Sequence, residues 1–130
     1  MISILTTVTL AINALVFLGF GLMFGFWTDT WAQVLHIQLN SPTAYADFRA
    51  MYGGLSIGVG LFFAAALIRS DFVTAALFVA ATTSGFLALG RVYTFAITEG
   101  RVENFIYWIL AAEVTNALVA AWLFTVHSRK

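Results

Sequence analysis

The alternation of apolar and polar positions divides the chain into four long hydrophobic stretches joined by short polar connections. Each stretch reaches or exceeds the roughly 20 residues that a helix, rising about 1.5 Å per residue, needs to cross about 30 Å of hydrocarbon. The stretches run from Ile2 to Trp27, from Ala44 to Ile68, from Phe72 to Ile97 and from Asn104 to Val126. The pattern predicts an all-α integral membrane protein in which residues 1–130 form one four-span domain.

The connections predict how these helices follow one another. The turns between Ile68 and Phe72 and between Thr98 and Glu103 are short enough to make consecutive helices antiparallel neighbours, with Gly100 available for a left-handed helix terminus. We therefore expect an up-down-up-down four-helix bundle.

The longest connection, Thr28 to Thr43, carries two competing signals. Its apolar residues have helical spacing, whereas the five residues from Leu35 to Leu39 alternate as a strand would, so we expect an interfacial segment whose conformation stays open. The sequence Asn40-Ser41-Pro42 is a helix-start signal and places the beginning of the second span near Pro42.

Composition narrows the class of protein further. Hydrophobic residues make up 62% of the chain and charged residues only 9%, against roughly 25% charged in soluble domains. The formal net charge is zero and no basic stripe occurs, which argues against nucleic acid as a partner. The absence of cysteine removes disulfide and thiolate chemistry.

Basic residues near the ends of the spans predict the orientation. Arg69, Arg129 and Lys130 share one side, whereas Arg101 lies on the other side together with acidic residues. Because Lys and Arg are enriched in cytoplasmic connections, we expect both termini to be cytoplasmic.

Small residues at four-residue spacing mark where helix backbones can approach closely. The predicted packing positions are Gly21 and Gly25 in the first span and Gly54 and Gly58 in the second, with Ala117 and Ala121 in the fourth. Ordinary packing within one bundle is the first interpretation. Binding of a flat lipophile or of another subunit against the bared backbone remains open.

Three charged side chains lie within the spans. Arg49, Arg91 and Glu113 lie about 6, 9 and 14 Å from the same predicted boundary, counting about 1.5 Å per residue. An unpaired charge inside the bilayer costs at least about 2.5–3.5 kcal/mol. We therefore expect Arg91 and Glu113 to interact directly or through one polar group, with Arg49 close enough to contribute.

With Tyr52 and Asn116, these residues form a predicted polar cluster in the outer leaflet. Three interpretations stay open: an ion pair that fixes the register of the helices, a site for a headgroup or carbonyl under an aromatic rim, and a short proton or ion pathway.

Motifs for catalysis and cofactor binding are missing from the sequence. His36 and His127 lie in different extramembrane segments, so they cannot share a metal ion, and we predict no metal site, no cofactor and no catalytic residue. An isomerase or transferase acting on a lipid stays open, because such enzymes need few polar residues.

Two segments carry a resemblance to a known family: Phe48-Arg49-Ala50-Met51-Tyr52-Gly53-Gly54 and Ala88-Leu89-Gly90-Arg91. In these the chain resembles a bacterial family of four-span membrane proteins catalogued as a domain of unknown function. The similarity covers essentially the whole chain, and Glu113 matches an acidic position in the family's last span. The resemblance implies the four-span fold and a location in the bacterial inner membrane, and it implies no activity.

Three functions are compatible with these features. The first is an accessory, assembly or stabilising subunit of a larger membrane complex, for example a respiratory or photosynthetic one, with membrane lipids and other membrane-protein subunits as partners. The alternative is a binding or scaffold protein for an isoprenoid, quinone, hopanoid or other lipid. A small transporter ranks last, because the two halves show no internal repeat.

Overall fold

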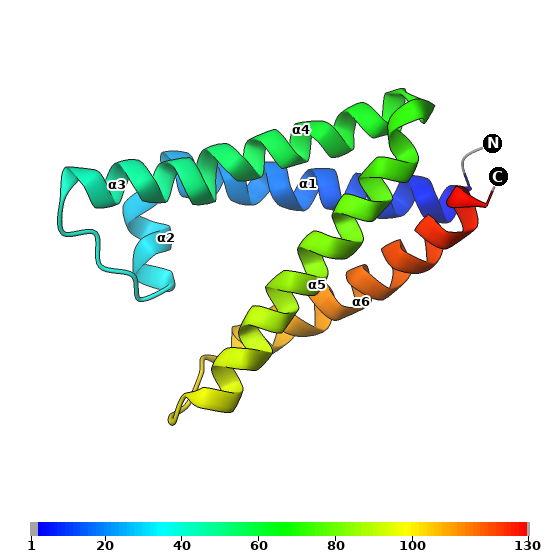
Figure 1. The fold of residues 1–130 in the computed structure, drawn as a ribbon. Helices are drawn as coiled ribbons and strands as arrows, with labels where there is room; N and C mark the ends of the chain where they lie inside the picture. Colours follow the sequence, from blue (N-terminus) through cyan, green and yellow to red (C-terminus); the bar gives the residue numbers. More distant parts are fainter. Residues whose placement is uncertain (1–2, 130) are drawn as a thin grey trace. The chain divides into compact units, whose positions relative to one another are not determined.

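The computed structural model describes residues 3–129, and within this range it contains helices and no strand. The helices in chain order are α1 (Ile4–Phe26), α2 (Thr28–Val34), α3 (Pro42–Phe48), the π-helix η1 (Arg49–Gly54), α4 (Leu55–Ile68), the 3-10 helix η2 (Ser70–Phe72), α5 (Val73–Ile97) and α6 (Asn104–Ser128) (Figure 1). The predicted all-α, four-helix class is confirmed. Ile2, where the first span was predicted to begin, and Lys130 lie outside the described residues.

Four of the described segments are long and apolar enough to cross a membrane: Ile4–Phe26, Pro42–Ile68, Ser70–Ile97 and Asn104–Ser128. The shortest has 23 residues, which corresponds to about 34 Å of helix. The chain is therefore a multi-pass membrane protein. Its second span combines α3, η1 and α4 into one continuous helical segment.

The chain divides into two units, which are described separately here. The α1/α4 unit comprises Leu10–Ile68, and the α5/α6 unit comprises Arg69–Lys130 together with the first residues of the chain up to Thr9.

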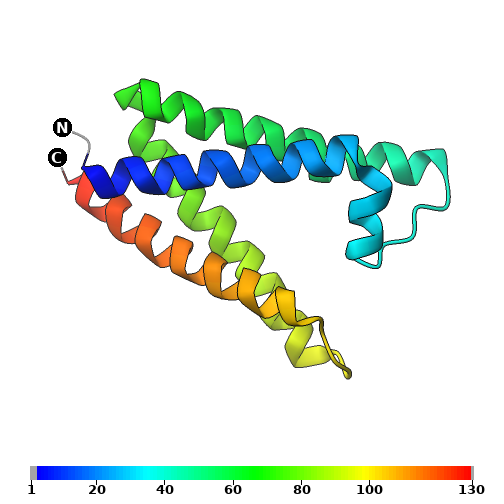
Figure 2. The same ribbon diagram turned by 180° about the vertical axis from the view of Figure 1, so that it is seen from behind.

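In the α1/α4 unit, α1 and α4 run side by side and antiparallel (Figures 1 and 2). A methyl group built on Gly21 would lie 2.7 Å from Ile57 Cγ1 and 2.8 Å from Ile57 N, and one built on Gly53 would lie 3.0 Å from Gly25 Cα. Only residues without a Cβ allow such a close approach of two backbones. Gly60 makes a similar approach to Leu18.

The packing glycines of the second span differ from the prediction. Gly21 and Gly25 lie at the contact as expected, but a methyl group on Gly58 would have no neighbour within 4 Å, and one on Gly54 would meet only Arg49 O of its own helix. Gly53 and Gly60 take their place. The predicted packing glycines were therefore correct in the first span, whereas in the second span the prediction chose glycines on the wrong face of the helix.

The segment between the first two spans is helical in its first half. Ala32 of α2 joins Phe24 and Phe48 in a buried cluster, against which Trp31 and neighbouring apolar side chains pack. The alternating residues after α2 form no strand, and His36 takes a left-handed conformation with φ 55°. The predicted helix start is confirmed, because Ser41 Oγ accepts a hydrogen bond from Ala44 N with Pro42 in the first turn.

The α5/α6 unit contains an antiparallel helical hairpin (Figure 1). Small side chains recur every fourth residue on the buried face of α5, and Ala120 and Leu123 are buried on α6. The small residues of α5 are Ala76, Ala80, Ser84 and Ala88. Gly100 has the predicted positive φ, 128°, but it lies within the connection, since α5 ends at Ile97 and the next residue, Thr98, is extended.

Candidate polar sites within the spans

The strongest polar contact in the α5/α6 unit joins Arg91 to Glu113. Arg91 Nε donates to Glu113 Oε2 at 2.8 Å, and Arg91 Nη2 donates to Glu113 Oε1 at 3.0 Å. The side chains are 28% and 12% exposed, respectively. The parallel pair of bonds is the fork geometry that guanidinium and carboxylate groups favour. The predicted direct interaction of these two residues is confirmed.

A second polar contact lies one turn further along α6 and two turns away along α5. Asn116 Nδ2 donates to Ser84 Oγ at 2.7 Å, and the Ser84 side chain is buried. The positions 113 and 116 on α6 therefore meet 91 and 84 on α5. Two polar contacts at helical spacing can be satisfied together in only one register of the hairpin.

In the α1/α4 unit, Arg49 makes a different kind of contact. Its Nε donates to Thr28 Oγ1 at 3.0 Å, and the buried Thr28 hydroxyl in turn donates to the carbonyl oxygens of Phe24, at 2.9 Å, and Gly25, at 3.1 Å. The last carbonyls of α1 have no partner within the helix, so Thr28 satisfies them and presents its oxygen to Arg49. Among the described residues, no acidic side chain forms an ion pair with Arg49.

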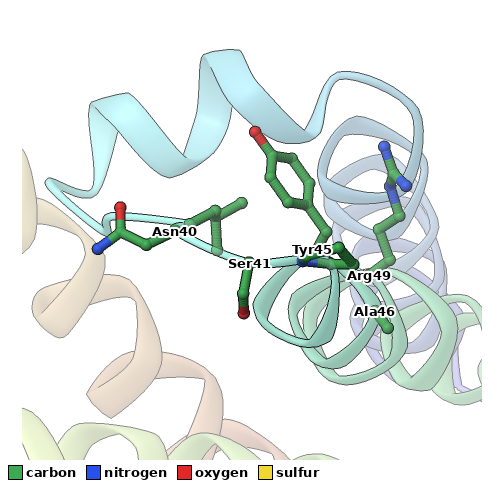
Figure 3. Close-up of a pocket in the computed structure, with 7 residues that line it drawn as sticks. Asn40, Ser41, Tyr45, Ala46 and Arg49 are labelled. Carbon is green, nitrogen blue, oxygen red and sulfur yellow. The ribbon is translucent and has the colours of Figure 1, made fainter.

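Tyr45 connects this contact to α2. Its hydroxyl donates to a carboxylate oxygen of Asp29, and the Arg49 guanidinium lies 5.5 Å from the centre of its ring. Figure 3 shows the side chains of Tyr45 and Arg49 rising on the same side of the chain. Beside them is an open depression of about 510 Å³, whose lining includes Asn40, Ser41 and Ala46.

Arg49 opens the π-helix η1, which the sequence did not predict. The N–H of Leu55 bonds to the carbonyl of Ala50, five residues earlier, instead of four. Tyr52 within η1 stacks on Phe48 at 4.6 Å between ring centres and meets Phe24 edge-on at 5.6 Å. Short π-helical turns inside α-helices occur frequently at functional sites.

The contacts sort the predicted polar cluster into two groups. Arg91, Glu113 and Asn116 lie together on the facing sides of α5 and α6. Arg49 and Tyr52 have their own partners in the α1/α4 unit. A single pocket formed by all five residues stays a prediction.

Sequence reasoning missed Thr28 and Ser84, which are the acceptors for Arg49 and Asn116. A signal for Ser84 was present, because it continues the four-residue series of alanines on α5. For Thr28, the only signal in the sequence was its position at the end of the first span. Across residues 3–129, no group of three His, Cys, Asp or Glu side chains is placed to hold a metal ion.

Four apolar helices define a small multi-pass membrane protein, and its Arg91, Glu113 and Asn116 side chains form hydrogen bonds between helices. A family described as a domain of unknown function, DUF4345, matches residues 5–124. The chain belongs to this family, as the resemblance in the second and third spans indicated. No curated protein and no solved structure matches the chain.

Proposed function

We propose that the protein is an accessory, assembly or stabilising subunit of a larger membrane complex, of which respiratory and photosynthetic complexes are examples. The observation that carries this proposal is an apolar groove along the α5/α6 hairpin, whose lining includes Ala81, Ala117 and Ala121. Phe78 and Phe124 also line it, and their ring centres lie 5.5 Å apart. Small residues on a membrane helix suit the close approach of another helix.

The use of the polar side chains supports a role in packing. Arg91, Glu113, Ser84 and Asn116 bond to one another across the hairpin. A transport or catalytic site would leave acidic or basic groups facing a water-filled path. Here these groups stabilise the hairpin that presents the groove.

The surface of α6 agrees with this role. It is the least buried of the four spans, and it exposes Trp108, Leu118 and Trp122 by 78%, 67% and 57%. Exposed aromatic residues on a membrane helix serve equally for lipid contacts and for subunit contacts, so the groove is the feature that favours a subunit.

The test is copurification from native membranes in mild detergent with a substitution that fills the groove. Ala117→Leu should abolish recovery of partner proteins. Ala112→Leu adds the same side chain at an exposed position of the same helix and should preserve recovery. Recovery of the chain as a free monomer that retains full cellular function would contradict the proposal.

A second candidate function is binding or scaffolding of an isoprenoid, quinone, hopanoid or other lipid, which the protein would take from the surrounding membrane. Arg49 favours it, because this side chain lines an open depression and has no acidic partner among the described residues. For either function we propose the bacterial inner membrane as the location, with both termini cytoplasmic and without nucleic acid as a partner.

A further inference from the structure

The hydrogen bonds of Arg49 leave most of its donors unused. A guanidinium carries five N–H donors, and within residues 3–129 only the Nε donor of Arg49 is engaged, by Thr28 Oγ1 at 3.0 Å. Asp29 accepts the Tyr45 hydroxyl, and no acidic side chain in this range forms an ion pair with Arg49. The four N–H donors on the two Nη atoms therefore remain available to an external acceptor.

The guanidinium is held in place before any ligand arrives. Thr28 is fixed by its own bonds to the carbonyls of Phe24 and Gly25, and the Tyr45 ring lies against the guanidinium carbon at 5.5 Å. An arginine held by its Nε and by an aromatic face loses less conformational freedom on binding than a free surface arginine does.

The chemistry of the open donors selects the ligand class. A planar fork of N–H groups bonds two oxygens of one phosphate, and charge-assisted bonds of this kind are stronger than those to a neutral carbonyl. Asn40 and Ser41 also line the depression, and their polar ends point away from the Arg49 guanidinium in Figure 3, so the guanidinium is the group that contacts the phosphate. Leu39 lines the depression with an apolar side chain. Pro42 and Ala46 are further apolar residues that line the same depression as Arg49.

From these observations we infer that Arg49 and the depression beside it form a binding site for one phosphate group, borne by an anionic lipid. The inference rests on the second candidate function and names its ligand chemistry. The apolar lining of the depression, formed by Leu39, Pro42 and Ala46, provides a surface for the first carbons of the acyl chains of that lipid. A soluble phosphate offers the same oxygens but gains nothing from this surface.

The experiment uses the full chain in nanodiscs of phosphatidylcholine that contain a small fraction of phosphatidylglycerol, with retained lipid measured by native mass spectrometry. The wild-type protein should retain phosphatidylglycerol above its bulk fraction. Arg49→Gln should lower that retention by about tenfold, the loss expected when one charge-assisted contact is removed. Arg69→Gln, at an exposed arginine that pairs with Asp71, is the matched control and should retain the lipid.

Two further measurements keep the result interpretable. Arg49→Lys keeps the charge without the fork and should fall between wild type and Arg49→Gln, which separates lost binding from lost folding. Inorganic phosphate added to the protein in neutral detergent distinguishes the sources: binding that depends on Arg49 without lipid retention assigns the site to soluble phosphate. Equal lipid retention and equal phosphate binding in wild type and Arg49→Gln would overturn the inference. If, in that case, a neutral lipophile copurified with both wild type and Arg49→Gln, the second candidate function would still hold, but the phosphate site at Arg49 would not.

Discussion

Glu113 on α6 binds Arg91 on α5 through both carboxylate oxygens, at 2.8 and 3.0 Å. Neither charge would be tolerated alone inside the membrane, so each stabilises the other's place in its helix. One turn away on α6 and two turns away on α5, Asn116 and Ser84 form the next contact between the same two helices. These contacts fix the register of an interface made otherwise of small and apolar residues.

The first prediction concerns the ion pair. Glu113→Ala strands Arg91 and should destabilise the protein by about 2–3 kcal/mol. This is below the about 3–5 kcal/mol of a fully buried pair, because Arg91 lies one to two turns from the end of α5 at Ile97 and its long side chain can reach water at the interface. Glu113→Gln should cost less, since an amide oxygen still accepts one hydrogen bond from arginine. The free energy of unfolding in mixed detergent micelles measures both changes.

The matched control for this prediction is Asp71→Ala. Asp71 pairs with Arg69 at 3.7 Å in a connection where the two side chains are 64% and 79% exposed. Exposed pairs of this kind contribute little, at most about 1 kcal/mol. If Asp71→Ala and Glu113→Ala had equal effects, the special role of the intramembrane pair would be disproved.

The Arg91–Glu113 contact could be predicted from sequence for two physical reasons. Charges within apolar stretches need partners, and helix rise gives the depth of each residue from the end of its span. Ser84 as the acceptor for Asn116 could not be predicted, because a serine on a membrane helix can also satisfy its hydroxyl with a carbonyl of its own helix. Thr115 does so, bonding to Ala111 O at 2.8 Å.

The second prediction concerns the Asn116–Ser84 contact. Asn116→Leu keeps the approximate shape of the side chain and removes the hydrogen bond to the buried Ser84. Bonds between membrane helices average about 0.6 kcal/mol, with a maximum of about 1.7 kcal/mol. We expect a loss within this range by the same unfolding measurement. The double variant Asn116→Leu/Ser84→Ala should cost little more than Asn116→Leu, whereas fully additive losses would show that the two side chains do not interact.

The third prediction tests the glycine contact between α1 and α4. Gly21→Ala would place a methyl group 2.8 Å from the backbone nitrogen of Ile57, so the helices must separate. Overpacking of this kind costs about 1–3 kcal/mol. Gly58→Ala meets no neighbour within 4 Å and should be neutral or stabilising, because alanine favours the helix by about 0.5–1 kcal/mol over glycine. Equal destabilisation by the two substitutions would contradict this arrangement of α1 and α4.

The face of the second span that meets α1 could not be predicted from spacing. Spacing alone marks both Gly54-x-x-x-Gly58 and the nearby Gly53 and Gly60 as small-residue positions. Gly53 and Gly60 lie seven residues apart and share one side of the helix, whereas Gly54 and Gly58 share another. Which of the two sides faces α1 depends on the tertiary contacts with Gly21, Gly25 and Leu18, which the sequence of the second span does not contain.

The last prediction concerns orientation in the membrane. The four spans alternate in direction, so residues after the second and fourth spans face one side, and residues after the first and third face the other. The basic residues Arg69 and Arg129 follow the second and fourth spans, which favours the cytoplasm for that side. Single cysteines can report this, because the chain contains none of its own.

Ser70→Cys and Ser128→Cys should react with a membrane-impermeant maleimide only after the inner membrane has been lysed. Asn40→Cys and Glu99→Cys should react in cells whose outer membrane alone has been permeabilised. Glu99 is preferable to Gly100 for this purpose, because Gly100 has a φ of 128° that a cysteine would strain. Labelling of Ser128→Cys from outside, together with protection of Glu99→Cys, would reverse the orientation and leave the four-span fold intact. If α5, the helix of 25 residues from Val73 to Ile97, crosses the membrane, its two ends lie on opposite sides of the bilayer. Labelling of Ser70→Cys and Glu99→Cys from the same side would therefore contradict the third span.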